Sequence, residues 1–211
     1  TGDTKVVPRG CGDGIYINTA GVGELIEGVD IAPTNIKAGM DIIVSGTLGD
    51  HAATVMAARH NLTLPPEIMS DSAPLCHLAA AMLAAAPSIA VLRDPTRGGV
   101  AASLNELAGA AGVGILLDEA AIPVHPAVQG VCDILGFDPL TLANEGKLLA
   151  FVPPEDTERV LAVMHADPHG RASCVIGHTT AEAPGSVGLR TSLGGIRVVD
   201  LPLGELVPRI C

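Results

Sequence analysis

The chain has 211 residues, a formal net charge of −11 at pH 7, 48% hydrophobic residues and only 1% aromatic residues. A chain of this length can bury a sizeable core, which must come from Ala, Val, Leu and Ile and therefore suits helices packed closely on a sheet. The acidic charge argues against a nucleic-acid surface or an anionic membrane surface, because both need clustered Lys and Arg. Any bound phosphate must be held locally.

The cysteines indicate a reducing compartment. They are Cys11, Cys76, Cys132, Cys174 and Cys211, with no C-x-x-C pair. An odd, widely spaced set predicts reduced cytoplasmic thiols, neither a disulfide framework nor a structural zinc site. No signal peptide is visible, and the longest apolar run, at 77–92, is interrupted by Pro87 and falls short of a membrane span. Since the chain begins at Thr1, we expect a fragment of a longer protein.

A glycine-rich start precedes an alternation of strands and helices. Glycines within residues 2–14 lead into a short strand at 15–19, and the connector at 30–41, with Pro33, marks a domain boundary. Apolar, β-branched runs predict strands at residues 42–45, 88–93, 113–118, 147–152 and 172–176, and a hairpin within 187–199. Helix formers and capping residues predict helices at residues 51–61, 70–85, 100–111, 125–135 and 155–165.

Two of these helices have expected starts that rest on capping residues. Asp50 is the candidate cap of the first helix, and the run 70–74, with Ser, Asp and an early Pro, is expected to open the second. The alternation is not regular enough to prove a parallel sheet. We therefore predict an α/β fold, α+β in some schemes, with a layered mixed sheet and flanking helices.

The most informative internal motif is Asp94-Pro-Thr-Arg-Gly-Gly99, between a predicted strand and a predicted helix. A helix N-terminus favours an anion, Arg97 can contact a phosphate or carboxylate, and Asp94 can hold a metal or a donor. Alternatively, Asp94 and Thr96 cap the helix, while Gly98 and Gly99 permit tight packing. The motif by itself does not decide between these interpretations.

Three further short motifs carry candidate chemistry. Lys5, in Gly2-Asp-Thr-Lys5, suits a phosphate but is also typical of a solvated strand start. His51 ends Gly46-Thr-Leu-Gly-Asp-His51 and can carry a proton, although we favour a first-turn residue that faces water. Glu145, in Asn144-Glu-Gly-Lys147, is a candidate general base if burial raises its pKa, and the alternative is an exposed turn with Glu145 paired to Lys147. His125 and His178 lack metal-ligand spacing, and we assign no residue of this chain as a metal ligand.

The last stretch, Val207-Pro-Arg-Ile-Cys211, ends on a cysteine. Pro208 cannot continue a helix or donate to a strand ladder, so the segment is expected to leave the fold, with Gly204 as a hinge. A thiol on such an arm can act as a nucleophile or acceptor. Taken alone, however, the position of Cys211 is more typical of an incidental cysteine at a frayed end.

In combination these motifs resemble the HypE family of hydrogenase maturation factors. The matching stretches are Gly2 to Val7, Gly46 to His51, Asp94 to Val100, Asn144 to Lys147 and Pro208 to Cys211. Their order and their span over the whole chain make the resemblance specific, and the terminal Pro-Arg-Ile-Cys distinguishes this family from its relatives in the ATP-binding superfamily of aminoimidazole ribonucleotide synthetase (PurM).

The resemblance implies a domain organisation and a reaction. Residues 1–33 would end an N-terminal domain that binds ATP and Mg²⁺ and forms a homodimer, 34–203 would form a PurM-like C-terminal domain, and 204–211 a flexible tail. The carbamoyltransferase HypF would load a carbamoyl group onto Cys211. ATP-dependent dehydration would convert that group to a thiocyanate, and the HypC–HypD complex would receive the cyano group for the iron of a nickel–iron hydrogenase.

The same resemblance assigns roles to residues. Cys211 is the covalent carrier, Glu145 the candidate base and Lys5 a contact to the ATP phosphates, with Asp94 and Arg97 as weaker candidates for shaping the site. The Mg²⁺ ligands would lie outside this chain, and the isolated 211 residues are expected to be inactive. Two alternatives stay open: another synthetase or kinase of the superfamily that acts on a free substrate, or a docking fragment without chemistry of its own.

Overall fold

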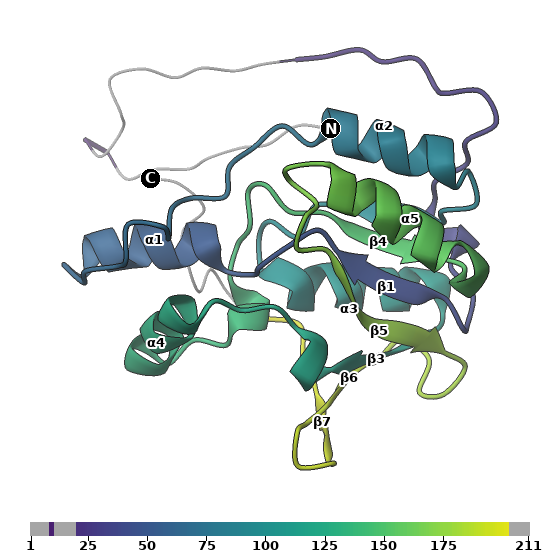
Figure 1. Cartoon of the computed structure of the whole chain (residues 1–211). Coiled ribbons are helices and arrows are strands. Elements are labelled where there is room, and N and C mark those ends of the chain that lie inside the picture. The colour runs from purple at the N-terminus through teal and green to yellow at the C-terminus, as the bar shows by residue number, and fades with distance from the viewer. Residues whose placement is uncertain (1–8, 11–19, 203–211) are drawn as a thin grey trace.

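The computed structural model describes residues 9, 10 and 20–202, and this part of the chain forms one mixed sheet with helices on both faces (Figure 1). Within it, seven strands lie in the spatial order β2-β4-β1-β5-β3-β6-β7. They are β1 (Asp41–Val44), β2 (Val91–Arg93), β3 (Gly114–Asp118), β4 (Leu149–Val152), β5 (Cys174–Thr180), β6 (Val187–Arg190) and β7 (Ile196–Val198). Only β3 and β6 pair in parallel among these neighbours, so the predicted mixed sheet is confirmed.

The helices form layers around this sheet (Figure 1). They are α1 (Asp50–Arg59), α2 (Cys76–Ala85), α3 (Gly99–Ala111), α4 (Pro126–Leu135) and α5 (Pro154–Ala166), with 3-10 turns η1 (Pro33–Asn35), η2 (Glu119–Ala121) and η3 (Pro139–Thr141). Helix α3 covers one face, and α2 and α5 pack against each other on the opposite face. Helices α1 and α4 contact each other beside the sheet.

Strand β1 shows how the two faces are filled. Successive side chains of a strand point to opposite faces, so Ile42 and Val44 join the core beneath α3 while Ile43 joins the core beneath α2 and α5. All three are fully buried. The continuous β-branched run that predicted a buried strand is therefore explained by helices on both of its sides.

Several predicted boundaries are wrong. Strand β5 continues to Thr180, beyond the predicted end at residue 176, because Thr179 is fixed by backbone bonds to Gly39 and Met40, each 2.8 Å long. Helix α2 begins at Cys76, later than the expected start at 70–74. Asp50 is the first residue of α1 rather than its cap, a position that Gly49 takes with a φ of 81°. The strand predicted at 15–19 lies outside the described residues.

The start of the described chain differs from the layered body. Val22 and Leu25 are fully exposed, whereas Ile36, just after η1, joins the core with 4% of its surface exposed. The domain boundary at residue 33 stays a prediction, but the change in burial falls close to it. Among the described residues, no helix is both long enough and apolar enough to span a membrane.

Candidate functional site

Three loops that are distant in sequence meet where strands β1 and β2 end and strand β4 begins. Strands β1 and β2 each run antiparallel to β4, so the residues that follow β1 and β2 come together with those that precede β4. These loops are residues 45–49, 94–98 and 142–148, and they contain three of the motifs that the sequence singled out. We refer to them, with Asp50 and the segment 70–73 that packs on them, as the loop cluster.

Asn144 joins the three loops. Its side chain is buried, and its Oδ1 accepts a hydrogen bond from the Gly49 amide at 2.8 Å. Its Nδ2 donates to the Pro95 carbonyl at 3.1 Å and to the Leu142 carbonyl at 3.0 Å, while its own amide also donates to Pro95 at 3.1 Å. A buried amide that is satisfied in this way holds the loops in one arrangement.

Lys147 lies between two carboxylates in the loop cluster. Its Nζ is 3.5 Å from Asp50 Oδ2 and 3.4 Å from Asp71 Oδ2, and the three side chains are 13%, 13% and 3% exposed. Asp50 also accepts a short hydrogen bond from the Thr47 hydroxyl. Charges this deeply placed need partners, and here two carboxylates share one ammonium group.

Glu145, the candidate base, is half-buried on the loop between Asn144 and Lys147. Its amide donates to Asp71 Oδ1 at 3.0 Å. An exposed turn is wrong, because Asn144 and Gly146 are buried and Glu145 is half-buried. The role of Glu145 as a base stays a prediction.

His51 does not face water, as the favoured interpretation held. It is only 6% exposed, and its Nδ1 lies 2.8 Å from the Ser70 hydroxyl. Ser70 belongs to the run that was expected to cap α2. Because the side chains of Ser70 and Asp71 bind His51 and the 145–147 loop instead, they do not cap α2, which begins only at Cys76.

The Asp94 to Gly99 turn uses its glycines for packing. Gly99 has a φ of 63°, and a Cβ there would lie 2.5 Å from the carbonyl oxygens of Leu140 and Leu142. The cap of α3 is Gly98, with no side-chain capping bond, so capping by Asp94 and Thr96 is wrong. Tight packing therefore accounts for the glycines, while the exposed side chains of Asp94 and Arg97 stay predicted binding residues.

Two of the predicted site residues, Lys5 and Cys211, lie outside the described residues. The Pro202 ring, at the last described residue, lies against Gly98, with its Cγ 3.7 Å from the position of a Cβ there.

Sequence reasoning missed Asp71 as a member of the site and Asn144 as its connecting residue. Asp71 stood in a run typical of helix caps, and its contacts to residues 145 and 147 join segments more than seventy positions apart. A signal was present in Lys147, because a lysine next to a buried strand needs a counter-charge. The sequence alone could not show which carboxylate supplies it.

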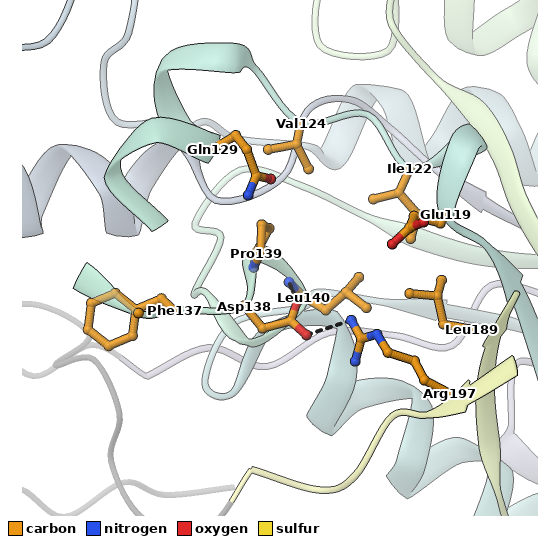
Figure 2. A pocket seen from close by; sticks show the side chains of 11 residues that line it. Glu119, Ile122, Val124, Gln129, Phe137, Asp138, Pro139, Leu140, Leu189 and Arg197 are labelled. Atoms are coloured by element: carbon orange, nitrogen blue, oxygen red, sulfur yellow. Dashed lines mark hydrogen bonds and ion pairs between the residues drawn. The ribbon is translucent and has the colours of Figure 1, made fainter. Parts of the chain in front are cut away.

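A cavity of about 510 Å³ lies elsewhere, between η2, α4, η3, β6 and β7 (Figure 2). In Figure 2 the side chains of Asp138 and Arg197 point toward each other, and Arg197 Nη2 lies 2.6 Å from Asp138 Oδ2. Glu119 accepts a bond from the Ser192 amide at 2.8 Å, and this bond lowers the pKa of its carboxyl. Of the predicted site residues that the structure describes, which are Asp94, Arg97 and Glu145, none lines this cavity.

No group of three or more His, Cys, Asp or Glu side chains within residues 9, 10 and 20–202 is arranged to hold a metal ion. Of the carboxylates at the loop cluster, those of Asp50 and Asp71 face Lys147. The contacts of Asp71 and Lys147 can fix the backbone of Glu145, whose side chain is half-buried and so still partly exposed to solvent.

Comparison with known proteins gives a consistent set of relatives. The family described as AIR synthase related protein, C-terminal domain, matches residues 37–190. The whole chain is 51% identical to carbamoyl dehydratase HypE of Rhodobacter capsulatus and 50% identical to that of Rhizobium leguminosarum bv. viciae. It spans 62% and 61% of the lengths of these relatives.

Solved structures agree with this similarity. A crystal structure of the hydrogenase maturation protein HypE has a TM-score of 0.82 and 40% identity, covering 86% of this chain and 58% of that one. A structure of a HypE–HypF complex has a TM-score of 0.79 and 39% identity, covering 84% and 58%. A structure of HypE in complex with ATP has a TM-score of 0.80 and 38% identity, covering 86% and 55%.

Proposed function

The chain belongs to the family of AIR synthase related proteins through its C-terminal domain, and from this premise we infer that it is part of an ATP-dependent carbamoyl dehydratase. One observation carries the inference: about half of the residues, along all 211 positions, are identical to those of carbamoyl dehydratases. The enzyme would act in the maturation of nickel–iron hydrogenases, where the thiocyanate it makes is the source of the iron cyanide ligands.

The whole activity needs more than these 211 residues. The chain spans about three-fifths of the length of its relatives, and its exposed Val22 and Leu25 precede the matched domain. We assign residues 1–33 to the end of a preceding domain, 34–203 to the PurM-like domain and 204–211 to the tail, and we expect residues 1–211 alone to lack ATP turnover.

The proposed reaction removes the elements of water from a carbamoyl group carried on the Cys211 sulfur. Because an amide oxygen is a poor leaving group, the γ-phosphoryl group of ATP is transferred to it, and one N–H proton is lost as a C=N bond forms. A base then takes the second N–H proton, the C–O bond breaks, and phosphate leaves with the electron pair. The products are a thiocyanate on Cys211, ADP and phosphate.

The loop cluster and the tail suit the two halves of this task. Pro202, the last described residue, lies against Gly98. The nine positions from there to Cys211 can span at most about 30 Å, so the proposed tail is long enough to bring Cys211 to the loop cluster or away from it. Glu145 stands on the loop that Asn144 and Asp71 hold, as a positioned base must. Lys5, Asp94 and Arg97 are assigned to the ATP side of the site.

Of the remaining components, ATP and HypF follow the names of solved relatives, and the others rest on the family resemblance. ATP is the co-substrate, as in the ATP-bound HypE structure, and its Mg²⁺ is expected to be held mainly by the part of the relatives that this chain does not span. HypF is the proposed donor of the carbamoyl group, in line with the HypE–HypF complex. A HypC–HypD complex is the proposed acceptor, and the enzyme is proposed to work as a homodimer in the cytoplasm.

Mass spectrometry of the C-terminal peptide tests this function. The full-length protein is carbamoylated by HypF and then given Mg-ATP, and we expect the Cys211 peptide to lose one water. The Cys211→Ala variant should show neither the adduct nor the loss. A carbamoyl adduct that persists under these conditions contradicts the dehydratase, and an unmodified, dispensable Cys211 favours a synthetase or kinase that acts on a free substrate.

A further inference from the structure

We propose that Asp71 is a positioning residue that sets the orientation of Glu145, through the Glu145 amide on one side and Lys147 on the other. The inference rests on the proposed function of Glu145 as the base of the dehydration. Asp71 lies between α1 and α2, and neither its place in the sequence nor the expected capping role predicts this contact.

The two oxygens of the Asp71 carboxylate have different partners. Oδ1 accepts the Glu145 amide at 3.0 Å, and Oδ2 lies 3.4 Å from the Lys147 ammonium. The side chain is 3% exposed, so water does not compete for these contacts. A carboxylate that binds a backbone N–H and a lysine two residues later fixes both ends of the short segment that carries Glu145.

The backbone of residues 71–73 lies directly against Gly146, between Glu145 and Lys147. A Cβ at Gly146 would lie 1.7 Å from the Asp71 carbonyl oxygen and 2.9 Å from the Ala73 nitrogen. The glycine between Glu145 and Lys147 is therefore what allows residues 71–73 to lie directly on the loop. Side chain and main chain of Asp71 act on the same three residues from the same side.

Neutralising Lys147 does not by itself explain Asp71. Asp50 already lies 3.5 Å from the Lys147 ammonium and is held by Thr47, so one carboxylate would suffice for an ion pair. What Asp71 adds is an acceptor for the amide of Glu145. Because the amide and the side chain leave the same Cα, an acceptor on the amide constrains where the Glu145 carboxylate points, and small displacements of a reacting group are costly in rate.

Two variants of Asp71 separate positioning from general stability. In the full-length protein, Asp71→Ala removes both contacts and is expected to slow dehydration of the carbamoylated protein about tenfold or more, with the KM for ATP unchanged. Asp71→Asn keeps an oxygen that can accept the Glu145 amide and should restore most of that rate. Asp133→Ala, at an exposed position of α4 outside the loop cluster, is the matched control and should behave like the parent protein.

Hydrogen exchange of peptides that cover residues 143–148 gives a readout that does not depend on the reaction. Exchange should be faster in Asp71→Ala than in the parent protein and unchanged in Asp133→Ala. If the parent protein proves not to dehydrate, the proposed function fails, while this measurement still decides whether Asp71 holds the loop. Equal exchange in all three proteins overturns the inference.

The kinetic outcomes are also decisive. A parental rate in Asp71→Ala overturns the inference. So does a loss in both variants that follows their melting temperatures, since that is the signature of a purely structural residue. If Asp71→Ala fails to fold, the folded Asp71→Asn variant decides: a rate near the parental one at pH 7 and normal exchange over 143–148 support the proposal, and a rate reduced as strongly as in Glu145→Gln contradicts it.

Discussion

The loop cluster and the cavity of Figure 2 use charged residues in opposite ways. In the loop cluster, Asp50, Asp71 and Lys147 are 3% to 13% exposed and tie together segments from three parts of the chain. At the cavity, the side chains of Asp138 and Arg197 are 34% and 43% exposed, and their ion pair joins β7 to the start of η3 at the surface. The cavity offers space, whereas the loop cluster offers constraint.

Under the proposed function, the chemistry lies at the constrained loops and not at the cavity with the larger volume. Burying charge is costly, and a chain that keeps three buried charges around one loop gains a fixed geometry in return. A surface ion pair loses little hydration when it forms, and it contributes little to the free energy of unfolding. Substitutions at the two places should therefore change the free energy of unfolding by different amounts. The predictions below run from the largest expected effect to the smallest.

Lys147→Met should cause the largest loss of stability. It leaves the carboxylates of Asp50 and Asp71 facing each other with no ammonium between them. Breaking a buried ion pair from one side costs about 3 to 5 kcal/mol. The free energy of unfolding from denaturant titration measures this, and a loss below 1 kcal/mol would show that the pair is no more important than a surface one.

Gly146→Ala should destabilise the protein by about 3 kcal/mol, because the new methyl group would meet the Asp71 carbonyl at 1.7 Å and backbone must move. The matched control is Gly130→Ala in α4, beside the cavity, where a Cβ meets nothing within 4 Å. That change should stabilise the protein by about 0.5 to 1 kcal/mol. Thermal unfolding compares the two, and equal effects would contradict the close approach at Gly146.

Cys132, in the helix beside the cavity, should make the stability of the protein depend on pH in the alkaline range. Burial, followed by the charges of Asp133 and Asp138, raises the pKa of its thiol from 9.0 to about 11. Both folded and unfolded states keep the proton below pH 9. Between pH 9 and 11 only the unfolded state releases it, so stability falls by about 2 to 3 kcal/mol as pH rises.

The Cys132→Ala variant isolates this thiol from the other groups that titrate at alkaline pH. Its free energy of unfolding should fall less steeply between pH 9 and 11 than that of the parent protein. Parallel curves for the two proteins would rule out a thiol that stays protonated in the fold.

Arg197→Met should have the smallest effect. The Arg197–Asp138 pair is solvent-exposed on both sides, so its loss should change the free energy of unfolding by less than about 1 kcal/mol. The difference from the parent protein should shrink further in high salt. A loss as large as that of Lys147→Met would erase the distinction between the two regions.

Much of the fold could be predicted from the sequence, because local patterns determine it. The β-branched run at 42–44 forms a buried strand, and the mixed sheet with flanking helices is as expected. The errors fall where side chains bond to distant segments. Ser70 and Asp71 have the chemistry of helix caps, and only their contacts to His51 and the 145–147 loop explain why α2 starts later.

The candidate site was predictable in its parts but not in its assembly. Glu145, Asp94 and Arg97 stood in motifs that the sequence could mark. The loops that carry these residues come together only because β4 runs antiparallel to both β1 and β2, and no local sequence pattern reveals that pairing. For the same reason Asn144 was visible only as part of a turn, although its side chain connects all three loops.

The central claim, that the chemistry belongs to the loop cluster and not to the cavity, is tested most directly by one matched pair of variants. Glu145→Gln and Glu119→Gln each replace one carboxylate by an amide, the first in the loop cluster and the second at the cavity. The measurement is the rate at which the carbamoylated full-length protein loses water from Cys211 with Mg-ATP. We predict a fall of about a hundredfold or more for Glu145→Gln and no change for Glu119→Gln, whereas a normal rate in Glu145→Gln would contradict the claim.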